Sequence, residues 1–327
     1  MTGALREIGG YLELERFSGQ PYHRAEDGAV ALNSGRACLE YLIELRGMEA
    51  IWLPDWLCSS VPAACAKHGV EVRTYRVGWD MRPAYDFEVT EGEYLYLVDY
   101  YGQLDAADVE EAGARSGGRL VVDEAQGFFR PPWPGADTLY TCRKFFGVAD
   151  GGYLYAGDGA RLARELPRDE SHGRMGFVLG RFERPAGEFF AQARANNERF
   201  ADEPVKLMSP ITENVMRAID YEAVRERRDA NWRVLDEALR DVNGLRSKAP
   251  DGAFMYPLLV EGADGVRQRL AAEGVFVPTL WPNCLSERGG GSVALRYSRD
   301  VLPLPVDQRY GWEDMEHMVD VLRRFEA

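Results

Sequence analysis

The sequence predicts an α/β protein with a mostly parallel sheet of the seven-stranded type, sandwiched by helices and followed by a smaller C-terminal α/β domain. Short apolar runs typical of strands alternate with helical segments from about residue 30 to residue 157. That alternation favours parallel strands joined by helices that cover both faces of the sheet. Beyond Gly244 short strand and helix patterns resume, which predicts the second domain. We assign residues 1–230 to the large domain and residues 231–327 to the small domain.

The expected strands of the large domain are short and rich in β-branched or aromatic residues. They are Ile51–Pro54, Val72–Val77, Tyr94–Tyr100, Leu120–Asp123, Thr138–Cys142 and Tyr153–Tyr155. The helices expected between them are Ala37–Arg46, Val61–His68 and Ala106–Arg115. In sheets of this kind ligands bind at the carboxyl ends of the strands. The residues that follow each strand are therefore the first candidates for a site.

The C-terminal part of the chain begins with a long helical pattern, for which Thr212 is the expected N-cap. The strands expected in the small domain are Phe254–Val260 and Val293–Tyr297, and its expected helices are Gly265–Glu273 and Trp312–Phe325.

Composition narrows the classes of partner. The chain has 327 residues, 46% of them hydrophobic, and a formal net charge of −14. The length and the apolar content predict a substantial core. The negative charge disfavours nucleic acids and anionic membranes as partners, because both are themselves negatively charged. No apolar stretch is long enough to span a membrane and the N-terminus lacks a signal-peptide pattern, which favours a cytoplasmic location.

The cysteines and histidines give no sign of a metal site. The five cysteines form no CxxC pair, so we expect neither a disulfide framework nor a zinc site. The four histidines are dispersed along the chain, which disfavours a histidine-based metal centre.

A turn suited to an anion precedes the first predicted helix, at Asn33, Ser34, Gly35 and Arg36. Small polar residues and a glycine leave backbone N–H groups exposed at the positive end of the helix dipole, where an anion is favoured. The same residues are equally typical of an ordinary Asn or Ser N-cap. The segment alone does not decide between the two interpretations.

Asp123 ends a predicted buried strand, and Gln126 follows three residues later. A carboxylate in such a place is unfavourable unless it meets a cation or hydrogen-bond donors. A protonated pyridine nitrogen is one such cation, and an ionised aspartate beside it would keep the ring positively charged. Gln126 could then donate a hydrogen bond to a phenolate oxygen on the ring. The alternative is an aspartate that caps the next helix.

Lys144 follows a predicted strand and is flanked by Phe145 and Phe146. An apolar pocket, with Arg143 as a neighbouring cation, would lower the pKa of the lysine and make it a nucleophile for Schiff-base formation. The alternative is a surface lysine, which the flanking aromatic residues disfavour. The remaining lysines lie in polar segments and are expected at the surface: Lys67, Lys206 and Lys248.

Taken in order, these segments resemble the DegT/DnrJ/EryC1/StrS family of sugar aminotransferases, which depend on pyridoxal 5'-phosphate (PLP) and have the architecture called fold-type I. The matching segments are NSGRACLEYL (33–42), WLPDWLCSSVPAA (52–64), LVDYYGQLDAAD (97–108), VVDEAQGFF (121–129), TLYTCRKFFGVADGGYL (138–154) and SRDVLPLPVDQRY (298–310). Each segment alone is weak, and the specific signal is their order and separation.

The resemblance implies a role for each matching residue. Lys144 matches the Schiff-base lysine, which also moves a proton between the substrate and the cofactor. Asp123 matches the partner of the pyridine nitrogen, and Gln126 matches the residue beside the phenolate oxygen. Gly35 and Arg36 match the phosphate-binding turn, and Thr141 matches a hydroxyl residue that contacts the phosphate.

The sequence also departs from the family pattern. The family places an aromatic residue over the pyridine face, where the alignment puts Cys58, and Trp56 is the nearest aromatic candidate. The loop before Lys144 is shorter than usual. The Gly-x-Asn-x-Arg stretch through which a partner subunit completes the site is absent, and residues 176–183 are the candidate replacement. These departures indicate a divergent, short member.

The function implied by the resemblance is transfer of an amino group from an amino acid such as glutamate to a keto group, on a sugar or a sugar-like metabolite. Family members are homodimers with sites at the interface, so a homodimer is expected. Tyr22 and His23, before the phosphate turn, and Trp281 and Arg309, on the small domain, are candidate substrate residues. For each of them, a packing aromatic or a surface arginine is the alternative.

Two other functions stay open at this point. One is a different PLP-dependent reaction, by a lyase or a desulfurase, for which Cys284 on a Gly-rich segment is the candidate cysteine. The other is a non-catalytic partner protein with the same fold.

Overall fold

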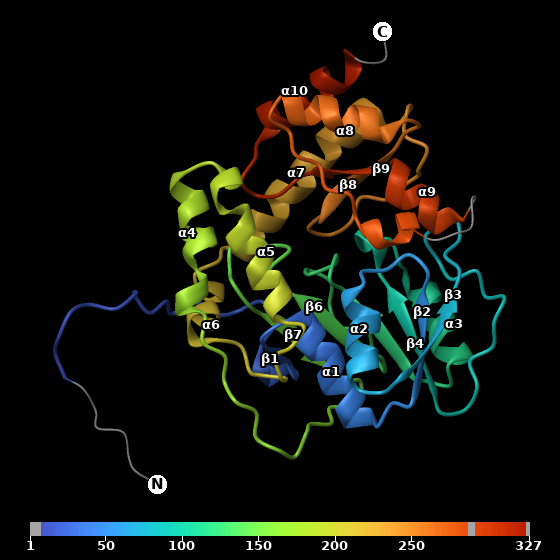
Figure 1. Ribbon diagram of the computed structural model, residues 1–327, viewed down its shortest axis with the longest axis vertical. Coiled ribbons are helices and arrows are strands. Elements are labelled where there is room, and N and C mark those ends of the chain that lie inside the picture. The colour runs from blue at the N-terminus through green and yellow to red at the C-terminus, as the bar shows by residue number, and fades with distance from the viewer. Residues whose placement is uncertain (1–7, 287–291, 325–327) are drawn as a thin grey trace.

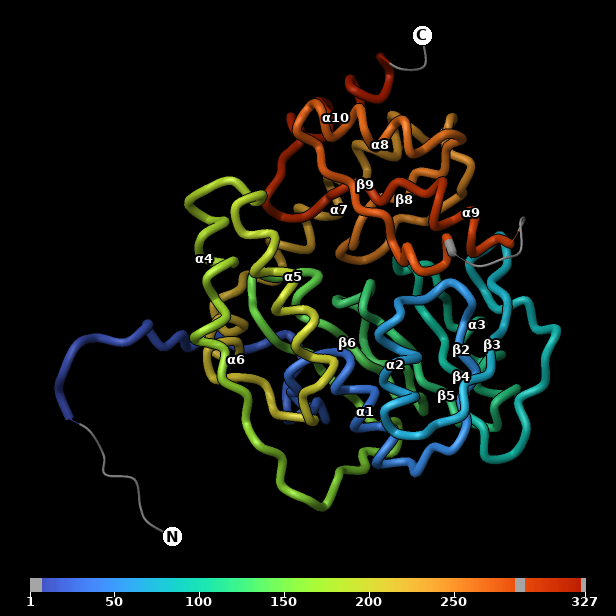
Figure 2. The backbone as a smooth tube through the Cα atoms, in the orientation of Figure 1, coloured from blue at the N-terminus to red at the C-terminus, as the bar shows by residue number. Residues whose placement is uncertain are grey.

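The computed structural model describes residues 8–286 and 292–324. A large sheet with its helices forms the main body, and the C-terminal elements stand over one end of it (Figure 1). The N-terminal segment extends away from the body past helices α4 and α6 (Figures 1 and 2). The predicted end of the last helix at Phe325 falls outside the described residues.

The main sheet has seven strands in the order β1-β7-β6-β5-β4-β2-β3. They are β1 (Val30–Leu32), β2 (Ala50–Pro54), β3 (Glu71–Tyr75), β4 (Glu93–Val98), β5 (Leu120–Asp123), β6 (Asp137–Thr141) and β7 (Gly152–Tyr155). β7 is antiparallel to both of its neighbours, whereas the strands from β6 to β3 pair in parallel. The predicted fold class, a mostly parallel sheet between helices, is confirmed.

Burial explains why these short runs become strands. β5, β6 and β7 are buried along their whole length, as expected for inner strands covered on both faces. The edge strand β3 is mostly exposed. The crossover helices are α1 (Gly35–Arg46), α2 (Ser60–Lys67) and α3 (Ala106–Arg115), within two residues of their predicted bounds.

Four helices follow the main sheet. They are α4 (Gly176–Glu183), α5 (Phe190–Arg199), α6 (Pro210–Met216) and α7 (Tyr221–Leu239). The prediction of one long helix with Thr212 as its N-cap was wrong. Ser209 is the N-cap instead, since its hydroxyl accepts a hydrogen bond from the Thr212 N–H and Pro210 begins the helix. α6 ends at Met216, and Asp220 caps a separate helix, α7.

The C-terminal elements form a two-stranded antiparallel sheet with helices. They are β8 (Met255–Leu259), α8 (Ala263–Ala272), α9 (Val293–Asp300), β9 (Val301–Pro305) and α10 (Trp312–Arg323). The predicted strand Val293–Tyr297 was wrong, because these residues lie in α9. Ser292 caps that helix, and Ala294 and Tyr297, three residues apart, form its buried face.

Two hydrophobic cores are present. The larger one surrounds the main sheet, and the second lies between α7, α10 and the two-stranded sheet. The second core begins within α7, at Trp232 and Leu235, so α7 runs from one core to the other. The boundary at residue 230 stays a prediction.

The first strand residue of β7 lies against the turn before α1. A Cβ atom on Gly152 would stand 2.7 Å from the carbonyl carbon of Ser34 and 2.9 Å from the nitrogen of Gly35. We therefore expect Gly152→Ala to lower the free energy of unfolding by about 1–3 kcal/mol, the usual effect of overpacking. Urea unfolding measures the change, with Gly173→Ala as control, because a Cβ there would meet nothing within 4 Å. Equal stability of the two variants would contradict the close approach.

Candidate active site

The predicted site residues come together at the carboxyl edge of the sheet. Asp123 ends β5 and Thr141 ends β6, and these two strands are adjacent and parallel. Lys144 follows Thr141 by three residues. The segment after β2, which carries Cys58, reaches the same edge, since Cys58 acts electrostatically on Lys144. The sheet topology thus gathers side chains that are far apart in the sequence.

Lys144 follows β6 and is exposed to solvent. Its side chain has accessible surface, yet protein surrounds it so closely that burial lowers the pKa of its ammonium group. Asp123 and Cys58 oppose this by favouring the charged form, whereas Arg143 adds to the lowering. The Phe254 ring, from the small domain, has its centroid 5.5 Å from the Lys144 Nζ. Such an amine is easier to deprotonate, and only the neutral amine is nucleophilic.

Both carboxylate oxygens of Asp123 are held in place. Oδ2 accepts a hydrogen bond of 2.8 Å from the Tyr96 hydroxyl, and Oδ1 accepts one of 2.8 Å from the Ala125 N–H. Sequence reasoning missed Tyr96. The register pairs Val98 of β4 with Asp123 of β5, which places Tyr96 diagonally across on the same face. A strand alignment could have found it.

Gln126 holds a strained loop. Its Oε1 accepts a hydrogen bond of 2.7 Å from the Tyr101 N–H, and Tyr101 has a left-handed backbone with φ of 55°. The Tyr101 hydroxyl is buried and has no hydrogen-bond partner in the described part of the chain. With Oε1 engaged, the amide nitrogen of Gln126 is the group left to donate to a ligand, as the sequence predicts.

The turn before α1 meets the end of β6. Ser34 is the N-cap of α1, and its hydroxyl accepts a hydrogen bond of 3.0 Å from the Ala37 N–H. A Cβ on Gly35 would lie 3.5 Å from the Thr141 Cβ, so the turn and the threonine are in contact. The N-cap interpretation of Ser34 is correct. It leaves the backbone N–H groups of the turn available for an anion.

Two arginines near this turn have unpaired donors. Nε and Nη1 of Arg36 and Nε of Arg143 are buried, and within residues 8–286 and 292–324 they have no hydrogen-bond partner. Burial, and next the repulsion from Arg36, lower the pKa of Arg143 to about 10. The Arg143 guanidinium also lies 4.6 Å from the centroid of the Phe200 ring. Two buried cations with free donors fit the phosphate of PLP, so the residues present suit this cofactor.

Trp56 and Cys58 differ in what they offer to a ligand. Trp56 is fully buried, stacks on Tyr100 at 4.6 Å and donates from Nε1 to the Ser298 hydroxyl at 3.1 Å. It therefore has no free ring face. Cys58 is partly exposed, and its Sγ accepts a hydrogen bond of 3.5 Å from the Ser60 N–H. Of the two side chains, Cys58 is the one that acts electrostatically on Lys144.

Tyr22 and His23 make structural contacts. His23 is buried, its Nε2 lies 3.0 Å from the Phe128 carbonyl oxygen, and burial lowers its pKa to about 3. The Tyr22 hydroxyl donates to the Phe129 carbonyl at 2.7 Å. Both side chains support the segment after Gln126, and a direct role toward a substrate stays a prediction.

The two candidates from the C-terminal part of the chain have different surroundings. Trp281, with a left-handed φ of 53°, packs edge-on against Trp56 at 4.6 Å. Arg309 is exposed and forms an ion pair of 2.6 Å with Asp307. Their roles toward a substrate also stay predictions.

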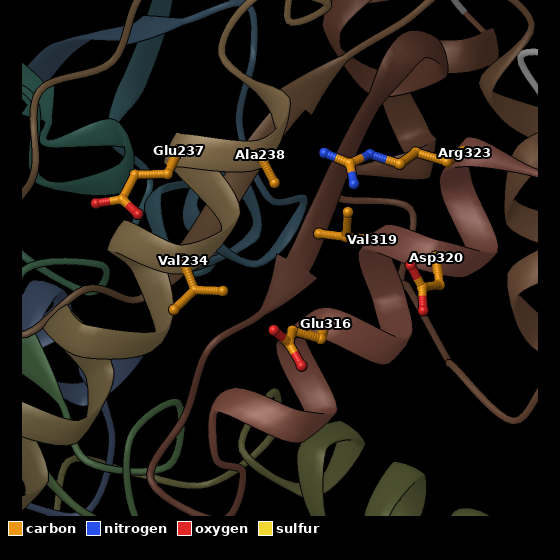
Figure 3. Close-up of a pocket in the computed structure, with 7 residues that line it drawn as sticks. All are labelled: Val234, Glu237, Ala238, Glu316, Val319, Asp320 and Arg323. Atoms are coloured by element: carbon orange, nitrogen blue, oxygen red, sulfur yellow. The ribbon is translucent and has the colours of Figure 1, made fainter.

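A surface groove lies elsewhere, between α7 and α10 on the small domain (Figure 3). Its lining includes three carboxylates, on Glu237, Glu316 and Asp320, and none of the predicted site residues. Across the described ranges, no group of His, Cys, Asp and Glu side chains could hold a metal ion, and no helix is long and apolar enough to cross a membrane.

The fold is similar to that of solved aminotransferases. No protein-family model matches the sequence, and no curated protein matches it either. The sugar aminotransferase CalS13 from Micromonospora echinospora superposes with a TM-score of 0.66 at 16% identity, over 91% of this chain and 87% of that chain. DesV from S. venezuelae, solved with a ketimine intermediate, gives 0.63 at 18% identity, over 91% and 84%.

A third similar structure is a DegT DnrJ EryC1 StrS aminotransferase from Brucella abortus. Its TM-score is 0.60 at 17% identity, over 91% of this chain and 85% of that chain. These likenesses extend over nearly the whole chain, and they confirm that the chain has the fold of the aminotransferases that its motifs resemble.

The lowered pKa of Lys144 predicts selective acylation. At a mildly alkaline pH a larger fraction of Lys144 is neutral than of an ordinary lysine, so it should react first with an amine-specific acylating reagent in the PLP-free protein. Mass spectrometry over a series of pH values measures the rate at each lysine. Lys248, which is 72% exposed, is the reference. Faster labelling of Lys248 at every pH would contradict the prediction.

The unpaired arginine donors predict anion binding. Inorganic phosphate should stabilise the PLP-free protein against heat, because a ligand that binds only the folded state raises its stability. Arg36→Ala should weaken phosphate binding about tenfold or more, since a hydrogen bond to a charged group contributes about 1.5–3 kcal/mol. Thermal melts at graded phosphate concentrations measure this, with exposed Arg181→Ala as control. Equal phosphate dependence in both variants would argue against an anion at Arg36.

Proposed function

We propose that the protein is a PLP-dependent aminotransferase in which Lys144 is the point of covalent attachment. The observation that carries this proposal is the placement of Lys144, with its lowered pKa, opposite Asp123 at the carboxyl edge of the sheet. The fold shared with sugar aminotransferases supports it. Fold alone does not fix chemistry, so the argument rests on these two side chains.

The cofactor, when bound, supplies an electron-withdrawing ring that stabilises negative charge on a substrate carbon. Asp123 would hold a proton on the pyridine nitrogen, and Tyr96 fixes the orientation of its carboxylate. The amine of Lys144 would take a proton from the substrate carbon and return one to the product carbon. Its lowered pKa keeps part of it neutral and able to accept that proton.

The remaining residues of the site would hold the cofactor. The backbone of Ser34 and Gly35, the hydroxyl of Thr141 and the guanidinium of Arg36 would bind the phosphate, which the contact between Gly35 and Thr141 and the unpaired donors of Arg36 support. Gln126 would donate to the phenolate oxygen. Arg143 adds positive charge beside the phosphate and lowers the pKa of Lys144.

We further propose an amino acid such as glutamate as the donor and a keto group on a sugar or a sugar-like metabolite as the acceptor. The sugar aminotransferases among the similar structures support a sugar acceptor. One of these, DesI, was solved in the presence of its TDP-sugar product. The reaction would follow ping-pong kinetics, because the donor would give its amino group to the cofactor and leave before the acceptor takes it.

The desulfurase alternative loses its candidate cysteine. Cys284 is fully buried, and its Sγ donates to the Asp55 carbonyl oxygen at 3.4 Å. A desulfurase needs a mobile, accessible thiol. Lyase chemistry is separated from amino transfer by the experiment below. The non-catalytic alternative is disfavoured because Lys144 and Asp123 are both in place.

A homodimer is part of the proposal, with the sites at its interface. Apolar side chains of the N-terminal segment are highly exposed, including Tyr11 at 99% and Leu12 at 92%. On α4, within the stretch 176–183, Phe182 is 95% exposed. A second copy would cover such surface. A cytoplasmic location is supported by the five cysteines, none of which forms a disulfide and four of which are buried.

The test is spectroscopic. The protein purified with PLP should absorb in the visible region, and borohydride reduction should leave a pyridoxyl group on Lys144, located by mass spectrometry. Glutamate should convert the bound cofactor to its amine form, and Asp123→Asn should slow this at least about 100-fold, the usual effect of losing one electrostatic partner. Lys144→Ala should lose the adduct, whereas Lys248→Ala should keep it. An adduct on another lysine, or none, would reject the proposal.

A further inference from the structure

We infer that Asp99 and Glu124 share a single proton and, together with Arg130, form a neutral brace that positions the turn carrying Asp123 and Gln126. This inference deepens the proposed function and rests on it for its meaning, since the turn is where the cofactor ring would be held. Asp99 and Glu124 are called the carboxyl pair below, and both act as positioning residues.

The carboxyl pair is buried and in contact. Both side chains are 0% exposed, at the ends of β4 and β5. Among the described residues, Oε2 of Glu124 has no hydrogen-bond partner, and Oδ2 of Asp99, which faces it, has an ion pair with Arg130 but no hydrogen bond of good geometry. A Cβ placed on Gly127 would overlap the Glu124 oxygen and lie 3.4 Å from the Asp99 oxygen, so both oxygens cover the same point of the backbone. Two ionised carboxylates there would repel strongly, and one shared proton turns the repulsion into a hydrogen bond.

The carboxyl pair and Arg130 together are neutral when the pair holds one proton. Arg130 Nε forms an ion pair of 3.1 Å with Asp99 Oδ2, and this is the cation that faces the pair. The Trp133 Nε1 donates to Glu124 Oε1 at 2.6 Å, and the Leu104 N–H donates to Asp99 Oδ1 at 2.8 Å. One negative charge on the pair therefore meets one positive charge on Arg130.

Among the described residues, Tyr140 is a further titratable group beside the brace. Burial raises the pKa of the Tyr140 hydroxyl, and the nearby Glu124 raises it further. This hydroxyl donates a hydrogen bond of 3.0 Å to the Arg130 carbonyl. Burial raises the pKa of both carboxyl groups, and Asp99 raises that of Glu124 further, so the pair retains a proton at a pH where a separate carboxyl group would lose it.

The brace joins two loops of the site. Glu124 follows Asp123 directly, and the turn closes with a hydrogen bond of 2.9 Å from the Gly127 N–H to the Glu124 carbonyl. On the other side, Asp99 accepts a hydrogen bond from the Leu104 N–H in the loop after β4. Arg130 donates to the carbonyl oxygens of Gly102 and Leu104 in the same loop. Gln126 bonds to Tyr101 of that same loop. Losing the proton would put a second negative charge into this junction and push the two loops apart.

The raised pKa of Glu124 determines how the contribution of the brace changes with pH. Because the pKa of Glu124 is raised in the folded state, its contribution is complete below the ordinary carboxyl pKa of about 4.5 and is lost as the pH rises through the folded value. PLP affinity should therefore fall on the alkaline side, by about tenfold for each pH unit beyond that value.

Infrared spectroscopy tests the proton directly. At pH 7 the PLP-free protein should show the C=O stretch of a buried protonated carboxyl group, and Glu124→Gln should remove it. Exposed Glu110→Gln is the matched control and should retain the band. Absence of the band in the unmodified protein, or its persistence in Glu124→Gln, would overturn the inference. The measurement on the unmodified protein tests the shared proton even if the Glu124→Gln variant does not fold.

PLP binding tests the positioning role. The side-chain amide introduced by Glu124→Gln can donate to Asp99 as the proton does, so this variant should bind PLP within about twofold of the original at pH 7 and lose the extra alkaline weakening. An unchanged alkaline slope would refute the role. If PLP binds neither protein at any pH, the proposed function fails while the infrared result still decides on the shared proton.

Discussion

The rest of the site depends on the electrostatic interaction between Lys144 and Asp123. Burial favours the neutral amine and Asp123 favours the ammonium, so the two effects oppose each other at one nitrogen atom. The balance depends on where the Asp123 carboxylate points, and Tyr96 and Ala125 fix that direction. The parallel pairing of β5 and β6 brings the two residues to the same edge. Strand register, burial and charge therefore together determine how readily the Lys144 ammonium group loses its proton.

Residues that follow the main sheet in the chain take part in placing Lys144. The carbonyl oxygen of Phe145, the next residue, accepts hydrogen bonds from Gln308 at 2.8 Å and from Arg228 at 3.2 Å. Arg228 is buried, and burial lowers its pKa to about 10. The centroid of the Phe254 ring lies 5.5 Å from the Nζ of Lys144. The position of the lysine thus depends on contacts from both parts of the chain.

Two pairs of groups with like charge are buried near the site, and the repulsion within each pair is relieved in a different way. Arginine does not give up its proton near neutral pH, so Arg36 and Arg143 are best satisfied by an anion. Carboxyl groups can keep a proton, so Asp99 and Glu124 can become a hydrogen-bonded pair without a ligand. The first arrangement favours binding of a phosphate, and the second stabilises the turn that would hold the ring of the same ligand.

The sequence by itself determined the sheet and the chemical character of the site, because apolar runs that end in Asp123 or precede Lys144 are local patterns. It also predicted the wrong start for α6, at Thr212, since a proline and a serine upstream compete for the cap. Only the tertiary structure decided that Tyr96 orients Asp123, and that Trp56 is enclosed in the core. Those contacts depend on strand register and on packing between distant segments, which no local pattern encodes.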